Sequence, residues 1–171
     1  FHSSLAPDLG MAGTSWSVLR KLCSDFPLLL KGSLALFDAD VTTSDLEKIR
    51  DESLYLVLPD SESLAIERRI IVFIIGLENA NPFFTELGKE RDTFLDEFKA
   101  ASIRSLTPKD VIDATKTSID RCKSWADFDK VQFKKCVTYY CRHSNFGADF
   151  RDRFLARINK INADIGLPSV K

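Results

Sequence analysis

The residues whose types come closest to a metal site are two cysteines and a histidine, Cys136, Cys141 and His143. On a helix of ~3.6 residues per turn the two cysteines would lie about 140° apart, and a zinc site would still need a fourth ligand. The seven glycines are scattered, so there is no glycine-rich phosphate loop, and no nucleophile elbow supports a hydrolase. We therefore expect no enzymatic activity, no cofactor and no metal.

Cations near the C-terminal end suggest a different chemistry, the binding of anionic surfaces. Residues 121–160 hold 10 Lys and Arg against 4 Asp and Glu, whereas residues 1–82 hold 7 against 12. Two interpretations stay open: a solvated basic face, or a contact surface for anionic lipid, nucleic acid or the acidic part of a neighbouring copy. The candidate residues for such a surface are Lys130, Lys134, Lys135, Arg142, Arg151, Arg153 and Arg157.

The hydrophobic residues recur at helical spacing along nearly the whole chain, which predicts an all-α protein. The candidate helix N-caps are Thr14 or Ser15, Ser44 in a capping box with Glu47, Thr107, and Asp127 or Asp129, and Gly166 is placed to end the last helix. Residues 83–101 are predicted to form one helix. Residues 55–58 have the composition of a strand. Because no alternating partner segment lies nearby, we interpret them as buried helix.

The most informative predicted helix covers residues 61–79, and its later turns, residues 70–75, are apolar on every side. A helix without a polar face must be enclosed on all sides. We therefore expect a central buried helix that joins two small helical lobes, each similar to a four-helix bundle. The predicted lobes are residues 1–82, which include this helix, and residues 83–171.

At this central helix the sequence resembles the matrix protein of orthomyxoviruses. Residues 55–70 are similar to the place where the fourth helix of that family ends, a Pro-Ser follows, and the fifth helix carries consecutive arginines. Pro59, Leu64, Arg68 and Arg69 fall in matching places. The resemblance adds Arg68 and Arg69 to the candidate residues for membrane or ribonucleoprotein contact.

Two further segments extend the resemblance. Residues 78–82 resemble the Asn/Gly/Asp-Pro linker of the family, and residues 136–148 resemble its Cys, Tyr and Gly-Ala helix-turn-helix. The order and spacing of the three segments agree from about residue 46 to residue 160. The acidic first half is more similar to the Thogoto/Dhori group than to influenza.

The resemblance implies two four-helix lobes joined by a central helix, with a separate C-terminal domain completing the molecule. It implies a non-enzymatic layer beneath the viral envelope, which bridges the anionic membrane and the viral ribonucleoprotein and supports assembly and budding. The expected location is the virion, on the inner face of the envelope, and in the host the cytoplasm, the cytoplasmic face of the plasma membrane and the nucleus.

Two departures from the influenza pattern limit what the resemblance implies. The basic nuclear-import run of influenza matches residues 93–97, which are acidic here, so RNA binding and nuclear import through that element are in doubt. The influenza Cys/His cluster matches residues 154–166, which contain neither residue type. No zinc is carried over.

The opposite charges of the two halves predict a head-to-tail homo-oligomer, in which Arg151, Arg153 and Arg157 meet the acidic half of the next copy. If the carboxylates there have raised pKa values, protonation near pH ~5 would weaken the contact. These carboxylates are Asp38, Asp40, Asp45 and Glu47.

The alternative function is an all-helical effector module that binds one host protein. The effector hypothesis predicts a monomer with a single exposed apolar patch. The shell hypothesis predicts self-association and salt-sensitive binding to anionic lipid.

Overall fold

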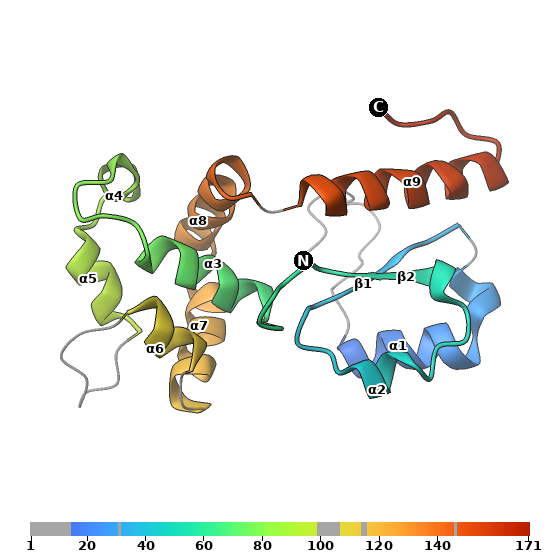
Figure 1. Cartoon of the computed structure of the whole chain (residues 1–171), viewed down its shortest axis with the longest axis horizontal. Coiled ribbons are helices and arrows are strands. Elements are labelled where there is room, and N and C mark those ends of the chain that lie inside the picture. The colour runs from blue at the N-terminus through green and yellow to red at the C-terminus, as the bar shows by residue number, and fades with distance from the viewer. Residues whose placement is uncertain (1–14, 31, 99–106, 114–115, 146) are drawn as a thin grey trace. The chain divides into compact units, whose positions relative to one another are not determined.

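The computed structural model describes residues 15–30, 32–98, 107–113, 116–145 and 147–171 (Figure 1). The described chain is mostly helical, as the periodicity predicted, and it contains a short sheet of two strands. The contacts define two compact units: unit 1 is Phe1–Leu58 with Asp149–Lys171, and unit 2 is Pro59–Ala148. Pro82 lies inside unit 2, so the compact units do not divide where the sequence analysis placed the boundary.

Unit 1 combines short helices with the sheet, so a four-helix bundle is not confirmed there. Of the two candidate caps for the first helix, it is Ser15 that serves, because its side chain accepts a hydrogen bond from the Val18 amide at 3.4 Å. Thr42, and not Ser44, precedes the second helix. The elements are α1 (Trp16–Asp25), η2 (Pro27–Leu30), β1 (Ala35–Phe37), α2 (Thr43–Leu46), η3 (Glu52–Leu54), β2 (Tyr55–Val57) and, from its second residue on, α9 (Ala148–Asp164).

The strand β2 corrects the prediction of a buried helix at residues 55–58. β1 and β2 pair in parallel, with Leu36 opposite Leu56, and the Leu58 amide donates to the Phe37 carbonyl at 2.9 Å. Parallel strands need a crossover connection and cannot be joined by a tight hairpin. The partner strand therefore lies well before β2 in the sequence, with α2 and η3 between them, and a search of the neighbouring residues misses it.

The core of unit 1 is small. It is built from Cys23, Ala35, Phe37 and Ile49, each at most 5% exposed, and the Phe37 ring packs edge-on against Tyr55 with the centroids 5.7 Å apart. None of the α9 residues whose burial is described is fully buried. Unit 1 therefore offers less enclosed apolar surface than unit 2.

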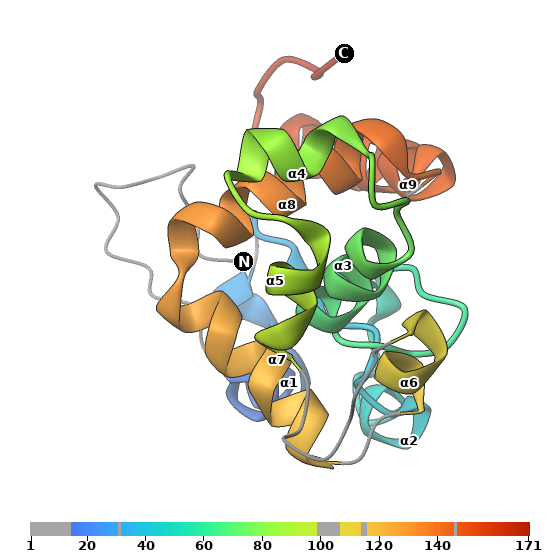
Figure 2. The same ribbon diagram turned by 90° about the vertical axis from the view of Figure 1, so that its left-hand side faces the viewer.

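Unit 2 is built around α3, which contacts α6, α7 and α8 (Figures 1 and 2). Thr107 and Asp110 form a capping box, which confirms the predicted cap at Thr107. Of the two candidates Asp127 and Asp129, it is Asp129 that caps the next long helix, by accepting from the Gln132 amide. The single helix predicted from residue 83 to residue 101 is interrupted at Gly88, whose φ of 78° ends a short first helix. The elements are α3 (Ile66–Ile75), α4 (Pro82–Leu87), α5 (Arg91–Asp96), α6 (Pro108–Ile112), α7 (Lys116–Phe128) and α8 (Lys130–His143).

The apolar run in α3 is enclosed, as its composition predicted, except at Phe73. Ile70, Ile71, Val72, Ile74 and Ile75 are all at most 6% exposed. Phe73 is partly exposed and packs against the rings of Tyr139 and Tyr140. All of the surrounding core residues belong to unit 2, so this helix is the centre of one unit and does not lie between two lobes.

The helix α3 is also shorter than predicted. The carboxylate of Asp60 accepts hydrogen bonds from the amides of Glu62, at 2.8 Å, and Leu64, at 3.2 Å. Ser63, between them, has a positive φ of 55°. These residues therefore form a turn that delays the start of the helix.

Candidate functional site

The helix α8 presents one face to the core and the opposite face to solvent. Cys136 is 0% exposed and Tyr140 is 5% exposed, and both belong to the core around α3. At about 100° per residue, the positions opposite these two are 130, 134, 138 and 142. The residues at all four positions are exposed.

The exposed face of α8 is cationic. Lys130, Lys134 and Arg142 are exposed, and Lys135 is half-buried with its Nζ donating to the Glu86 carbonyl at 2.9 Å. The sequence of α8 contains no Asp or Glu, and in the described chain no ion pair involves any of these four cations. We call these four residues the cationic face of α8. The sequence analysis predicted all four, and the structure brings them together.

The other two membrane candidates, Arg68 and Arg69, are used inside unit 2. The Arg68 Nε donates to the Val111 carbonyl at 2.6 Å, and its Nη2 donates to the Ile112 carbonyl. These carbonyls lie at the C-terminal end of α6, where helical partners are missing. Arg68 therefore has a structural role in unit 2, and its contact with a membrane or ribonucleoprotein stays a prediction.

Arg69 forms ion pairs with Asp60, whose side chain is 3% exposed, and with Glu62. Burial acts to raise the pKa of Asp60, but hydrogen bonds from Arg69 and from two backbone amides outweigh it and hold the pKa below its ordinary value. The hydrogen bond to Asp60 in turn raises the pKa of Arg69. This buried pair connects the turn before α3 to the helix, so Arg69 is also structural.

The arginines of α9 are partly occupied within unit 1. The Arg157 Nη2 donates to the Glu52 carbonyl at 3.4 Å, and the Arg151 Nε lies 3.6 Å from the Asp152 carboxylate. The pKa of Asp51 is lowered, first by hydrogen bonds from Ser53 and then by nearby charges that include Arg157. Arg157 thus meets the acidic segment of its own unit, whereas Arg153 is exposed on the same helix.

Among the acidic candidates, Asp45 is held by local hydrogen bonds. Asp45 pairs with Lys48 at 2.8 Å and accepts from the Thr42 hydroxyl at 2.7 Å, and these hydrogen bonds lower its pKa. The predicted protonation near pH ~5 is therefore wrong for Asp45, because a lowered pKa moves titration to more acidic pH. Asp40 and Glu47 are exposed, and Asp38 accepts from the Ala39 amide at 3.0 Å.

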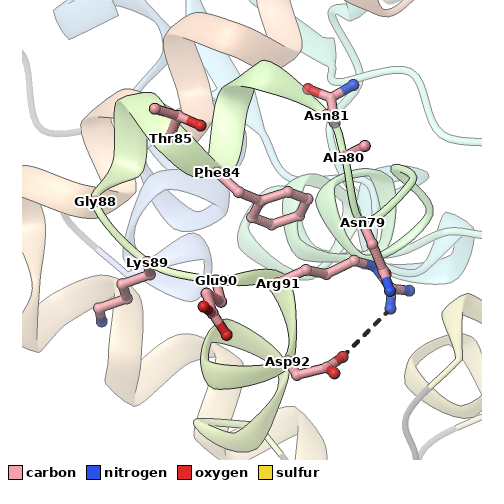
Figure 3. A pocket seen from close by; sticks show the side chains of 10 residues that line it. All are labelled: Asn79, Ala80, Asn81, Phe84, Thr85, Gly88, Lys89, Glu90, Arg91 and Asp92. Carbon is pink, nitrogen blue, oxygen red and sulfur yellow. Dashed lines mark ion pairs between the residues drawn. The ribbon is translucent and has the colours of Figure 1, made fainter.

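Unit 2 has a hollow of about 510 Å³ beside α4 and α5 (Figure 3). In Figure 3 the Phe84 ring lies at its centre and Lys89 points away from it. The Arg91 guanidinium donates to the Ile75 carbonyl at 2.7 Å and lies 3.8 Å from the Asp92 carboxylate, marked by the dashed line. Arg91 thereby satisfies the C-terminal end of α3, which gives this hollow a structural explanation.

A second hollow, of about 490 Å³, is lined by the Asp60–Arg69 pair, Phe73, Tyr140 and His143. The ring of His143 stacks on Tyr139 with the centroids 4.1 Å apart. Asp60, Arg69 and His143, which line this hollow, are therefore engaged in contacts within unit 2.

The cysteines differ in environment. Burial raises the pKa of Cys136 to about 12 and that of Cys122 to about 11, so both are thiols at neutral pH. Cys141, in contrast, is exposed on α8. No group of three or more potential metal ligands occurs among the described residues. Within the same residues, no helix has both the length and the apolar character needed to span a bilayer.

Sequence reasoning missed two exposed apolar residues that lie close to Lys130 in the sequence. Phe128 is 93% exposed and Val131 is 73% exposed. The available signal was periodicity: the buried stripe of α7 runs through Cys122, Trp125 and Ala126, and Phe128 does not continue it.

In comparisons with known proteins, no family model, no curated protein and no solved structure matches this chain. The function is therefore argued from the geometry of α8 and its surroundings.

Proposed function

We propose that the chain is a non-enzymatic shell subunit of the matrix type, which binds an anionic membrane surface through the cationic face of α8 and self-associates into a layer. The observation that carries the proposal is a helix without a carboxylate that presents three exposed cations, Lys130, Lys134 and Arg142, with the half-buried Lys135 beside them. Such a face concentrates positive potential and attracts phosphate and carboxylate groups. The resemblance to orthomyxovirus matrix proteins supports the proposal and adds viral ribonucleoprotein as the partner on the other side of the layer.

The attraction of a single copy to an anionic membrane is weak, which is why the proposal includes self-association. Each Lys or Arg near an anionic leaflet contributes about 1 kcal/mol. Four such residues give about 4 kcal/mol, which corresponds to a dissociation constant of about 1 mM. A single copy would bind weakly, whereas a layer of connected copies would gain avidity without any new contact.

A helical lobe like those of the matrix family is proposed for unit 2 only. Unit 2, with α3 enclosed by other helices, is the part we propose to correspond to a helical lobe. Unit 1 contains the two-stranded sheet, so we do not extend the four-helix lobe to it.

The test is co-sedimentation of the chain with vesicles of neutral lipid and with vesicles that also contain phosphatidylserine. We expect binding to the anionic vesicles only, and analytical ultracentrifugation should show concentration-dependent association. Equal binding to both vesicle types, or no binding to either, would contradict the proposal.

A second candidate, the effector module that binds a host protein, is favoured by one observation. Leu28 and Leu29 in η2 are 86% and 72% exposed, which forms an apolar patch on unit 1. This candidate predicts a monomer that does not bind vesicles, so the same two measurements distinguish it from the shell subunit.

A further inference from the structure

The corner between α7 and α8 holds an apolar side chain out into solvent. Phe128, the last residue of α7, is 93% exposed, and Val131, in the first turn of α8, is 73% exposed. Just before them, Trp125 and Ala126 are buried at 9% and 6% exposure. The exposed pair is therefore attached directly to a well-packed core.

The backbone of this corner is held by hydrogen bonds. The Asp129 amide donates to the Trp125 carbonyl at 2.8 Å, and the Phe133 amide donates to the Asp129 carbonyl at 2.9 Å. The Asp129 carboxylate accepts from the Gln132 amide at 3.1 Å and so caps α8. Because both helices are anchored on either side of it, Phe128 is presented by a structured turn.

The charged residues close to Phe128 indicate what kind of partner would bind at this turn. Lys123, Lys130 and Lys134 are exposed near Phe128 in the sequence, and the acidic residues beside it are Asp127, which is exposed, and Asp129, which is used as the cap. Apolar side chains next to lysines suit the boundary of an anionic bilayer, where cations meet phosphates and rings enter the acyl region. A protein partner would have to supply an apolar socket surrounded by carboxylates.

We propose that Phe128 and Val131 insert into the headgroup–acyl boundary of an anionic phospholipid bilayer while Lys130 and Lys134 contact its phosphates. The inference rests on the proposed function and deepens it, because it names an apolar contribution that the cationic face lacks. Transfer of a Phe side chain out of water strengthens binding about tenfold to a hundredfold. The corner would thus supply affinity that salt does not screen.

The experiment uses the full chain and vesicles of phosphatidylcholine with phosphatidylserine, titrated at low and at high salt. Phe128→Ala should weaken binding about tenfold and leave the salt dependence unchanged. Leu28→Ala, an equally exposed apolar truncation in unit 1, is the matched control and should bind as the wild type does. Asp127→Asn should bind more tightly, since it removes a negative charge next to the inserted ring.

Insertion can be observed directly with Phe128→Trp. Its additional fluorescence should be quenched by lipids that carry bromine on their acyl chains, over the background that the wild type gives from Trp16 and Trp125.

Wild-type binding with no change in Phe128→Ala would overturn the inference and leave the proposed function intact. Loss of self-association in Phe128→Ala without vesicles would also overturn it, because Phe128 would then contact a second copy. Failure of the wild type to bind anionic vesicles would instead remove the proposed function itself.

Discussion

Asp60 is the residue whose charge state matters most to the stability of unit 2. Its carboxylate, 3% exposed, accepts from two backbone amides and from Arg69, and its pKa is held below the ordinary value. A lowered folded-state pKa stabilises the protein above the ordinary value of about 3.9, and this contribution disappears as the pH falls through the folded-state pKa.

Replacement of Asp60 by Asn should therefore lower the free energy of unfolding by about 1–3 kcal/mol at neutral pH. The loss should shrink as the pH falls below about 4, where the carboxylate of the unfolded wild type becomes protonated, and should disappear below the folded-state pKa of Asp60. Urea denaturation at both pH values measures the difference. Glu62→Gln, at the more exposed partner of Arg69, is the control and should cost no more than about 1 kcal/mol. If the Asp60→Asn variant is as stable as the wild type at neutral pH, the pair is dispensable.

Within α3, the structure reverses the order of importance of two neighbouring side chains. The sequence predicted that residues 70–75 are all enclosed, but Phe73 is partly exposed, whereas Ile74 is 0% exposed. Ile74→Ala should cost about 2–5 kcal/mol, and Phe73→Ala should cost less than the usual range of about 3–5 kcal/mol for a buried Phe. Thermal and urea unfolding of the two variants give the comparison. A larger loss for Phe73→Ala than for Ile74→Ala would mean that the burial of α3 is misassigned.

At the scale of elements, the features that depend on neighbouring residues could be predicted from the sequence, whereas the contacts between residues far apart in the chain could not. The side chains of Ser15, Thr107 and Asp129 bond to amides within three residues, so they mark the starts of α1, α6 and α8 without knowledge of the rest of the fold. The cationic face of α8 was predictable for the same reason, because helical spacing alone gathers its residues.

Other features depend on partners far along the chain. β1 pairs with β2 across an intervening helix and turn, and Arg68 finds its acceptor 43 residues later at Val111. No local pattern distinguishes such an arginine from an exposed one. The helix end at Gly88 was only partly predictable. Glycine often ends a helix, but the apolar stripe continues on both sides of it and favoured one continuous helix.

Gly88 allows a direct test of why α4 and α5 are separate helices. Its φ of 78° lies in the left-handed region, and an added Cβ would meet nothing within 4 Å. Gly88→Ala should therefore cost about 1–2 kcal/mol from the backbone conformation alone. Urea denaturation should show this loss with an unchanged helical signal in circular dichroism. A neutral substitution would contradict the turn assigned to residue 88.

At the scale of the whole molecule, the two basic helices are expected to serve different partners. Arg153 is exposed on α9, so it is a candidate for contact with a neighbouring copy. Arg153→Glu should reduce self-association in sedimentation velocity and leave vesicle binding near the wild-type level. If it reduces both activities equally, α8 and α9 do not have separate roles.

The most direct test of the central claim is the salt dependence of binding to anionic vesicles, compared between the wild type and Lys130→Gln with Lys134→Gln. Two cations at about 1 kcal/mol each predict a loss of about thirtyfold in affinity at low salt, and a shallower salt dependence. Lys21→Gln with Arg50→Gln removes two exposed cations of unit 1 and should bind as the wild type does. The account is contradicted if the α8 variant binds as tightly as the wild type, or if both double variants lose the same affinity.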